Sequence, residues 1–332
     1  MNSFNNNGVG ASTAKQTVIV TGGNTGLGFE AARAIAESNQ GWHVVIACRN
    51  ARKAAAAVQK ITSGTAKGGV EAMSLDLMSL ASVRSFAQAY AGRDLPPLRG
   101  VVLNAGSQFV KGTTYTQDGF EATFGVNHLA HFLLVNLLLP QISAPARIVF
   151  VSSGTHDPEQ WSGMPAPRLQ KAESMANPKQ DASVAESPQQ VGQRCYTTSK
   201  LCNVLCAYEL ANRLQSSGRD VTVNAFDPGL IPGSGLARDF GPVSRFFWHF
   251  VLPVLRLVVK NVNSTRSSGN NLARLILDPS LAGVTRKYFV GVTESPSSKE
   301  SYDAVKASAL WEGSARLVGL TAEETLLQRS VK

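Results

Sequence analysis

Tyr196 and Lys200 stand four residues apart in the stretch CYTTSKLCN. At that spacing both side chains lie on one face of a helix and can meet. A phenol with a pKa near 10 transfers protons poorly at neutral pH, but a nearby ammonium stabilises the phenolate. Bringing that pKa near 7 takes about three units, or roughly 4 kcal/mol. The pair therefore predicts a general acid–base, although the spacing is common and its meaning depends on the rest of the chain.

A glycine-rich turn lies upstream, in the stretch TVIVTGGNTGLGFEAARAIAE from Thr17 to Glu37. A strand-like run leads into it and a helix-like run follows it, which is the context required for binding a dinucleotide. Glycines let backbone N–H groups approach a pyrophosphate, and the helix start adds roughly half a positive charge. The alternative is a plain strand–helix turn, which rarely needs three glycines. The turn residues that we expect to contact the cofactor are Gly22, Asn24, Thr25, Gly26, Leu27 and Gly28.

The second strand-like run ends in Cys48-Arg49-Asn50, at about the distance from the glycines where NAD-selective folds carry an acidic residue. A guanidinium pairs instead with a 2′-phosphate, so Arg49 predicts NADP(H) as the cofactor. The alternative is that Arg49 is a solvated surface cation. Asp76 and Leu77 close the third strand-like run and could contact the adenine, or Asp76 could simply form a turn.

Two further polar positions complete a candidate catalytic set. Ser152 and Ser153 end the strand-like run RIVFVS, at the carboxyl edge where ligands bind in open α/β sheets. A serine hydroxyl there can donate a hydrogen bond to a substrate carbonyl. Asn127 lies within a long apolar helix-like stretch, where an asparagine is unfavourable. It either satisfies a buried backbone group or holds a water molecule.

The elements that must position these residues alternate along the chain. Such alternation implies parallel strands joined by right-handed crossovers, and apolar strands imply a sheet covered on both faces. We therefore expect one doubly wound α/β Rossmann domain over 17–325, with about seven parallel strands and helices on both faces. The expected strands are 17–21, 42–48, 70–77, 100–104, 147–152, 221–226 and 286–290, and the expected helices are 26–38, 51–60, 81–90, 120–139 and 196–214.

Two stretches depart from this rhythm. Residues 154–194 are rich in Pro, Gln, Ser and Ala and are expected to form an irregular surface insertion. Residues 230–263 include the apolar run FFWHFVLPVLRLVV, which we interpret as a lid over a bulky hydrophobic substrate. There are two alternatives. The run could form an ordinary core helix, or residues 245–260 could make peripheral membrane contact with basic residues at the rim.

Composition limits the remaining function classes. The chain has 332 residues and a net charge of +9, but its Lys and Arg residues are scattered and form no dense run, so nucleic-acid binding is not expected. The four cysteines are too few and too oddly spaced for a disulfide framework. Cys202 and Cys206 could share one helix face, but a metal site would need further ligands that the sequence does not offer. Residues 1–16 lack the apolar core of a signal peptide, and no uninterrupted apolar run reaches the length of a membrane span. We expect a disordered tail at 1–16 and a cytoplasmic protein.

Taken together, these motifs resemble those of the short-chain dehydrogenase/reductase family. The shared marks occur in family order across most of the chain: TGGNTGLG at 21–28, LNAG at 103–106, Asn127, VSS at 151–153, Tyr196 with Lys200, and DPG at 227–229. Within that family, WHVVIACRN, VNHLAHFLLVNLLLP and SKLCNVL look like the branch that holds retinol dehydrogenases, WW-domain oxidoreductase and light-dependent protochlorophyllide reductase.

The resemblance implies roles for individual residues. Ser153 would orient a carbonyl, Tyr196 would transfer the proton, Lys200 would lower the tyrosine pKa and hold the nicotinamide ribose, and Asn127 would position a relay water. The residues that would flank the cofactor are Asn104, Ala105, Gly106, Tyr196, Lys200, Pro228, Gly229 and Ser234.

The expected function is NADP(H)-dependent reduction of a carbonyl, or oxidation of an alcohol, on a bulky hydrophobic small molecule. We expect the protein to be a monomer or homodimer. One alternative is light-dependent protochlorophyllide reduction, although Asp227 and Leu230 stand where such enzymes resemble YPGCV with a tyrosine and a cysteine. The other alternative is a catalytically silent NADP-binding sensor or scaffold, against which the intact serine, tyrosine and lysine argue.

Overall fold

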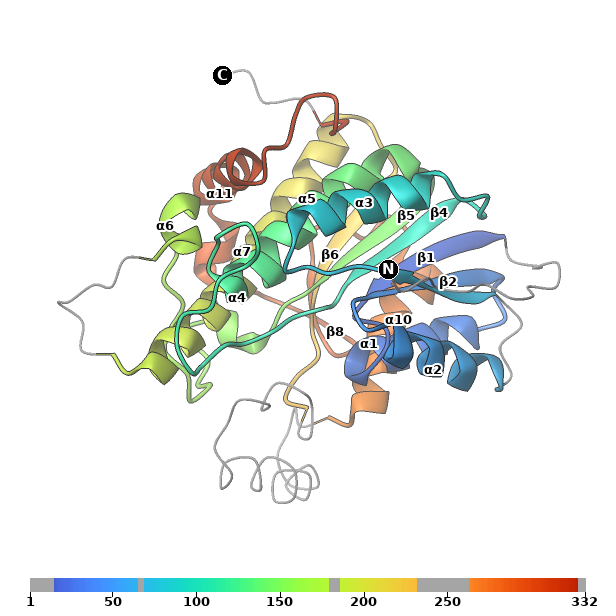
Figure 1. Ribbon diagram of the computed structural model, residues 1–332, viewed down its shortest axis with the longest axis horizontal. Coiled ribbons are helices and arrows are strands. Elements are labelled where there is room, and N and C mark those ends of the chain that lie inside the picture. Colours follow the sequence, from blue (N-terminus) through green and yellow to red (C-terminus); the bar gives the residue numbers. More distant parts are fainter. Residues whose placement is uncertain (1–14, 65–68, 179–185, 232–262, 328–332) are drawn as a thin grey trace.

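A computed structural model describes residues 15–64, 69–178, 186–231 and 263–327 of the chain (Figure 1). Within these ranges strands and helices alternate, as the sequence predicts. The strands are β1 (Gln16–Thr21), β2 (Trp42–Cys48), β3 (Val70–Ser74), β4 (Leu98–Leu103), β5 (Ile142–Val151), β6 (Val221–Asp227), β7 (Tyr288–Val290) and β8 (Thr293–Ser295). The helices of more than five residues are α1 (Gly26–Ala36), α2 (Ala51–Thr62), α3 (Leu80–Ala91), α5 (Ala130–Leu138), α7 (Pro188–Ser216), α10 (Thr265–Leu277) and α11 (Ala304–Leu317).

The strands form one sheet in the order β3-β2-β1-β4-β5-β6-β7-β8. Strands β1 to β7 pair in parallel, which confirms the predicted doubly wound Rossmann fold. The eighth strand was not predicted; it pairs antiparallel with β7 across a short turn at Gly291 and Val292. A strand of three residues is too short to show a periodic sequence pattern, so its pairing emerges only in the folded sheet.

Apolar side chains project from both faces of the sheet and pack against a layer of helices on each side. Helices α1, α2 and α10 cover one face, where Ile35, Ile61 and Leu272 are fully buried. Helices α3, α5 and α7 cover the other face, with α11 packed outside α7 (Figure 1). The two layers bury β2 and β6 throughout and most of β1 and β4, and the carboxyl ends of β1, β4, β5 and β6 carry polar turns.

The long apolar stretch after β4 is helical as predicted, but a π-helical turn interrupts its α-helical hydrogen bonding. It begins with the short helix α4 (Ala122–Phe124), continues as a π-helical turn over Gly125–Leu129, and only then enters α5. A single π-helical turn inserted in a helix frequently marks a functional site, and Asn127 lies within this one. The stretch Ala122–Gln141 has the length and hydropathy of a membrane span, but 94% of its most apolar window is buried inside the protein.

Several predicted boundaries differ from the observed ones. Strand β1 includes Gln16, which we assigned to the tail, and α7 begins at Pro188 instead of Tyr196. The segment 154–194 therefore holds the first turns of α7 and the short helix α6 (Ala172–Ala176). The missed signal is Ser187, which forms a capping box with Gln190 ahead of a proline at the first helical position. Most of the predicted tail (1–14) and of the lid (232–262) lies outside the described residues.

Candidate active site

The glycine turn between β1 and α1 needs its glycines for two different reasons. Gly22 and Gly26 have positive φ angles of 66° and 58°, which strain any residue with a side chain. Gly28 has an ordinary φ, but a Cβ atom there would lie 2.4 Å from Nδ2 of Asn104 and 2.5 Å from the carbonyl oxygen of Gly22. The turn can therefore close tightly against the end of β4 only with glycine at position 28.

The turns after β1 and β4 are hydrogen-bonded to each other. The hydroxyl of Thr21 accepts from the backbone N–H groups of Asn104 and Ala105 at 2.9 and 3.0 Å. The side chain of Asn104 donates to the carbonyl of Thr21 at 2.9 Å. Strands β1 and β4 are neighbours whose connections run to opposite sides of the sheet, so these turns meet at the point where open α/β sheets bind ligands.

The residues at this edge fit a dinucleotide. A Cβ atom at Gly26 would meet no atom within 4 Å, so the backbone there is open to a phosphate group. A Cβ atom at Gly106 would lie 3.6 Å from Nζ of Lys200 and 3.3 Å from Oδ1 of Asn127, which places the Asn104–Gly106 turn directly beside the candidate catalytic residues. Glycine at both positions keeps side chains out of this edge of the sheet.

Tyr196, Lys200 and Ser153 meet at the carboxyl end of β5. Tyr196 and Lys200 are 6% and 4% exposed on α7, and Nζ of Lys200 lies 5.4 Å from the centre of the Tyr196 ring. The Lys200 ammonium donates to the carbonyl of Val151 at 3.2 Å. The hydroxyl of Ser153 is hydrogen-bonded to the Tyr196 phenol. The three residues proposed from the sequence thus lie together, as a carbonyl-binding and proton-transferring group requires.

The pKa of Tyr196 is shifted upward, in the opposite direction to our expectation. Burial raises the pKa of Tyr196 well above its usual value, the charge of Asp227 raises it further, and the Ser153 hydrogen bond acts in the opposite direction. Burial also lowers the pKa of Lys200 to about 8, while Asp227 raises it. Desolvation and Asp227, which the spacing of Tyr196 and Lys200 does not reveal, are the two largest influences on the Tyr196 pKa. In this environment the phenol is protonated at neutral pH, which suits a proton donor.

The side chain of Asn127 is fully engaged with protein groups. Its Oδ1 accepts from the N–H of Ser107 at 2.8 Å, and its Nδ2 donates to the carbonyl of Ser107 and to the hydroxyl of Ser199, both at 3.0 Å. Of the two roles considered, this is the one that satisfies a buried backbone group. Both amide hydrogens are used, so the side chain connects the loop after β4 to α7 next to Tyr196.

His131 is a neighbour that the sequence analysis missed. Its Nδ1 donates to the carbonyl of Asn127 at 3.1 Å, and its Nε2 lies 3.0 Å from the hydroxyl of Thr21. Burial lowers the pKa of His131 to about 4, so the imidazole is neutral at pH 7. His131 therefore links the glycine turn to the π-helical turn that carries Asn127. The available signal was its position four residues after Asn127 in NHLAH.

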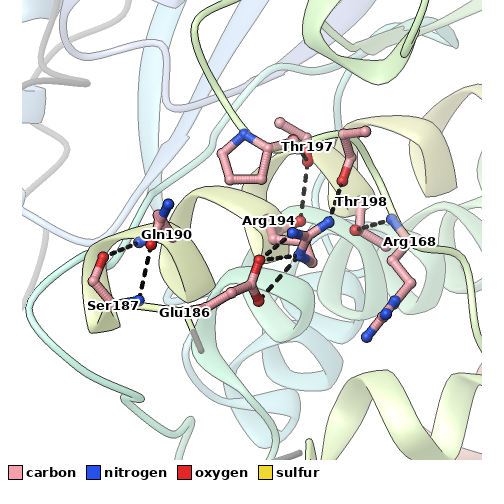
Figure 2. Close-up of polar contacts among 9 residues, drawn as sticks. Arg168, Glu186, Ser187, Gln190, Arg194, Thr197 and Thr198 are labelled. Atoms are coloured by element: carbon pink, nitrogen blue, oxygen red, sulfur yellow. Dashed lines mark hydrogen bonds and ion pairs between the residues drawn. The ribbon is translucent and has the colours of Figure 1, made fainter. Parts of the chain in front are cut away.

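Polar contacts around the start of α7 anchor the insertion beside Tyr196 (Figure 2). The guanidinium of Arg194 pairs with Glu186, with Nε 2.9 Å from Oε1, and donates to the carbonyl of Ala166. Thr197 donates to the carbonyl of Pro165, and the hydroxyl of Thr198 accepts from the N–H of Arg168. The loop before α6 is thus held against the helical turn that carries Tyr196.

The predicted adenosine-binding residues lie at the ends of β2 and β3. The side chain of Arg49 is 70% exposed, and its Nη1 lies 3.7 Å from Oδ1 of Asp76. Asp76 also accepts from the N–H of Met78, so it forms the turn that we considered as its alternative role. The side chain of Leu77 is buried in the core, which leaves only its backbone for a cofactor.

The turn after β6 reaches the same edge of the sheet. Gly229 has a φ of 72°, and its N–H donates to Oδ1 of Asp227 at 2.9 Å. The carbonyl of Pro228 accepts from the hydroxyl of Ser268 on α10 at 2.8 Å. Ser234 lies outside the described residues. Asp227 was noted in the sequence only as a departure from relatives, and its position beside Lys200 is a finding of the structure.

Comparison with known proteins supports this reading. Residues 16–164 match the family model described as short chain dehydrogenase, and residues 236–327 match one described as AcuH dehydrogenase domain. A protochlorophyllide reductase from Daucus carota is 35% identical over 324 residues, covering 92% of this chain and 79% of that protein.

Solved structures share the fold. A putative uncharacterized protein from Mycobacterium paratuberculosis is 30% identical with a TM-score of 0.65, covering 93% of this chain and 95% of that one. A blue fluorescent protein from a metagenomic library, solved in complex with NADPH, is 21% identical with a TM-score of 0.59, covering 85% of this chain and 99% of that one.

Proposed function

This chain belongs to the short-chain dehydrogenase/reductase family, and on that premise we propose that it interconverts a carbonyl and an alcohol on a bulky hydrophobic substrate with NADP(H). It is an NAD(P)-dependent oxidoreductase of that family. The observation that carries the proposal is the buried Tyr196 phenol, hydrogen-bonded to Ser153 and close to Lys200 at the ligand-binding edge of the sheet.

Each residue of the site has a separate role in the proposed reaction. In this proposal the Ser153 hydroxyl donates a hydrogen bond to the substrate carbonyl and orients it. Tyr196 gives its proton to the carbonyl oxygen as the carbon is reduced, and Lys200 holds the nicotinamide ribose. The glycine turn and Arg49 bind the pyrophosphate and the 2′-phosphate. The bound dinucleotide supplies the hydride.

The support for a hydrophobic substrate comes from the sequence. The run FFWHFVLPVLRLVV follows the turn after β6 in the chain and lies outside the described residues. Aromatic and aliphatic side chains at that place would form an apolar wall for the substrate. A screen of NADPH oxidation over hydrophobic aldehydes and ketones tests this class, and cofactor binding without turnover of any carbonyl would favour the sensor alternative.

The tyrosine can be tested directly. Replacing Tyr196 with Phe removes the proton donor, and we expect turnover to fall about 10²–10⁴-fold with NADPH binding unchanged. Stopped-flow or steady-state NADPH oxidation measures the rate, and fluorescence titration measures binding. Tyr208→Phe is the matched control, because Tyr208 lies on the same helix and its hydroxyl bonds to Ser297, away from the site. A Tyr196→Phe enzyme with full rate would remove the phenol from the mechanism.

Light-dependent protochlorophyllide reduction is the second candidate, because a protein of that name is 35% identical over most of this chain. Asp227 and Leu230 argue against it, since the resemblance leads us to expect a tyrosine and a cysteine there. Turnover of protochlorophyllide under illumination and its absence in darkness would establish this activity. Equal consumption of NADPH in light and dark with a carbonyl substrate would support the first proposal.

A further inference from the structure

Asp227 is a buried carboxylate beside the catalytic residues. It is the last residue of β6 and is 3% exposed. Its Oδ1 accepts from the N–H of Gly229 at 2.9 Å, and its Oδ2 lies 3.1 Å from where a Cβ atom of Gly154 would stand. The N–H of Gly154 is hydrogen-bonded to the same carboxylate. Asp227 thus ties the turn after β6 to the turn after β5 that carries Ser153.

The same carboxylate faces Lys200. Strands β5 and β6 pair so that Val151 lies opposite Phe226, the neighbour of Asp227. The Lys200 ammonium donates to the carbonyl of Val151, so it reaches the strand end next to Asp227. The two charges attract: Asp227 raises the pKa of Lys200, and Lys200 lowers that of Asp227, against burial in both cases.

A buried histidine and tyrosine fix the orientation of the carboxylate. The N–H of Ser298 donates to Nε2 of His156 at 3.0 Å, so Nε2 is the acceptor nitrogen and Nδ1 carries the proton. That proton is donated to the carbonyl of Ser153 at 2.8 Å. The hydroxyl of Tyr288 lies 3.4 Å from Nδ1, which cannot accept, so it donates to Asp227 instead.

We propose that Asp227 is a positioning residue that keeps Lys200 charged beside the protonated Tyr196 phenol, with Tyr288 and His156 linking it to the Ser153 turn. This inference rests on the proposed oxidoreductase function and deepens it. Among the described residues, the titratable groups that interact with the carboxylate are Lys200 and Tyr196 from α7 and Tyr288 from β7. His156 and Asp157, from the turn after β5, lie behind them and act on Tyr288.

The proposal has a defined consequence for pH dependence. Carbonyl reduction needs a proton on Tyr196 and a charge on Lys200, and a nearby negative charge favours both forms. Burial already lowers the pKa of Lys200 to about 8, so loss of the Asp227 charge would move it lower still. The Tyr196 pKa would also fall, because Asp227 raises it, but burial keeps that phenol protonated. The earlier loss of the Lys200 charge therefore shifts the alkaline limit of cofactor binding and of reduction toward lower pH.

The test compares three variants. Asp227→Asn removes the charge with little change of shape, and Asp227→Ser does so with a smaller side chain, which avoids placing an amide NH₂ against the N–H of Gly154. Asp220→Asn is the matched control, because Asp220 is exposed and directly precedes the opposite end of the same strand. NADPH affinity by fluorescence titration and kcat/KM of reduction are both measured from pH 6 to 10.

We expect the alkaline limb of both profiles to move down by about one pH unit or more in the Asp227 variants and to stay in place in Asp220→Asn. Folded Asp227→Asn or Asp227→Ser protein with an unshifted limb would overturn the inference, even if its rate is reduced, because a purely structural role changes amplitude and not the limb. If Asp227→Asn does not fold, Asp227→Ser decides. Wild-type protein that binds no NADPH at any pH would overturn the proposed function itself.

Discussion

Tyr196 and Asn127 are both buried beside Lys200, yet their partners give them different chemistry. The phenol of Tyr196 is bonded to a serine hydroxyl that a substrate carbonyl can approach, so its proton is available for transfer. The amide of Asn127 uses both hydrogens on Ser107 and Ser199, so it orders two elements and has no hydrogen left to donate. At this scale the residue type suggests a role, and the bonded partners decide it.

At the residue scale, Arg49 is the side chain that we propose selects the cofactor. Its exposed guanidinium is paired only loosely with Asp76, and exposed ion pairs are worth little, so it is available to a 2′-phosphate. We expect Arg49→Ala to weaken NADPH binding about 10- to 100-fold, because hydrogen bonds to charged groups contribute roughly 1.5–3 kcal/mol. NADH binding should not change.

Fluorescence titration with each cofactor measures both effects. Lys60→Ala is the control, because it removes an exposed positive charge from the other end of α2. Equal losses for NADPH and NADH in Arg49→Ala would contradict a specific contact with the 2′-phosphate and would point to the adenine or to the local fold.

At the scale of elements, α7 is the scaffold of the site. Its first turns pack against the loop after β4, and one residue makes this approach possible. A Cβ atom at Gly192 would lie 2.0 Å from the carbonyl oxygen of Phe109 and 2.9 Å from Cα of Val110. These are backbone atoms, so no change of side-chain rotamer can relieve the clash. Glycine at 192 therefore sets the distance between the helix of Tyr196 and the loop of Gly106.

We expect Gly192→Ala to lower the free energy of unfolding by about 1–3 kcal/mol, because the loop and the helix must separate. Turnover should also fall, since Tyr196 lies one turn further along α7. Denaturant unfolding and NADPH oxidation measure the two effects. The control is Gly92→Ala at the end of α3, where a Cβ atom would make ordinary contacts at 3.8 Å. Identical unfolding midpoints for the two variants would contradict the packing argument.

The insertion is held to α7 by a pair whose strength depends on pH. Arg194 lowers the pKa of Glu186 in the folded protein, so the pair stabilises the fold above the ordinary pKa of glutamate. That stabilisation is lost as the pH falls through the lowered value. The segment that we expected to be irregular is thus anchored close to Tyr196 by the Arg194–Glu186 pair (Figure 2).

At the scale of the whole molecule, two apolar layers on the sheet enclose neutral imidazoles. Burial lowers the pKa of His128 to about 3 and that of His131 to about 4. In the unfolded chain both would titrate near 6.5. The unfolded state therefore binds more protons below that pH, and the stability that these groups provide above it is lost progressively as the pH falls toward their folded pKa values.

This linkage predicts an acid-sensitive fold. Each imidazole should reduce the free energy of unfolding by about 2 kcal/mol between pH 7 and pH 5. Urea unfolding at the two pH values measures the change. His128→Gln removes one of the two titrating groups, so the difference between pH 7 and pH 5 should shrink by about that amount relative to wild type. An unchanged difference would show that His128 is not held neutral in the fold.

The sequence by itself determined the alternating elements, the glycine turn and the pairing of Tyr196 with Lys200, because these depend on short-range spacing and on apolar periodicity. It could not reveal the π-helical turn at Asn127 or the antiparallel strand β8, where local signals are short or ambiguous, whereas the early start of α7 had a signal in Ser187 and Gln190. Only the tertiary structure decided that Asp227 faces Lys200 and that burial outweighs the ammonium at Tyr196. The physical reason is that desolvation and through-space charge depend on groups that the sheet brings together from distant parts of the chain.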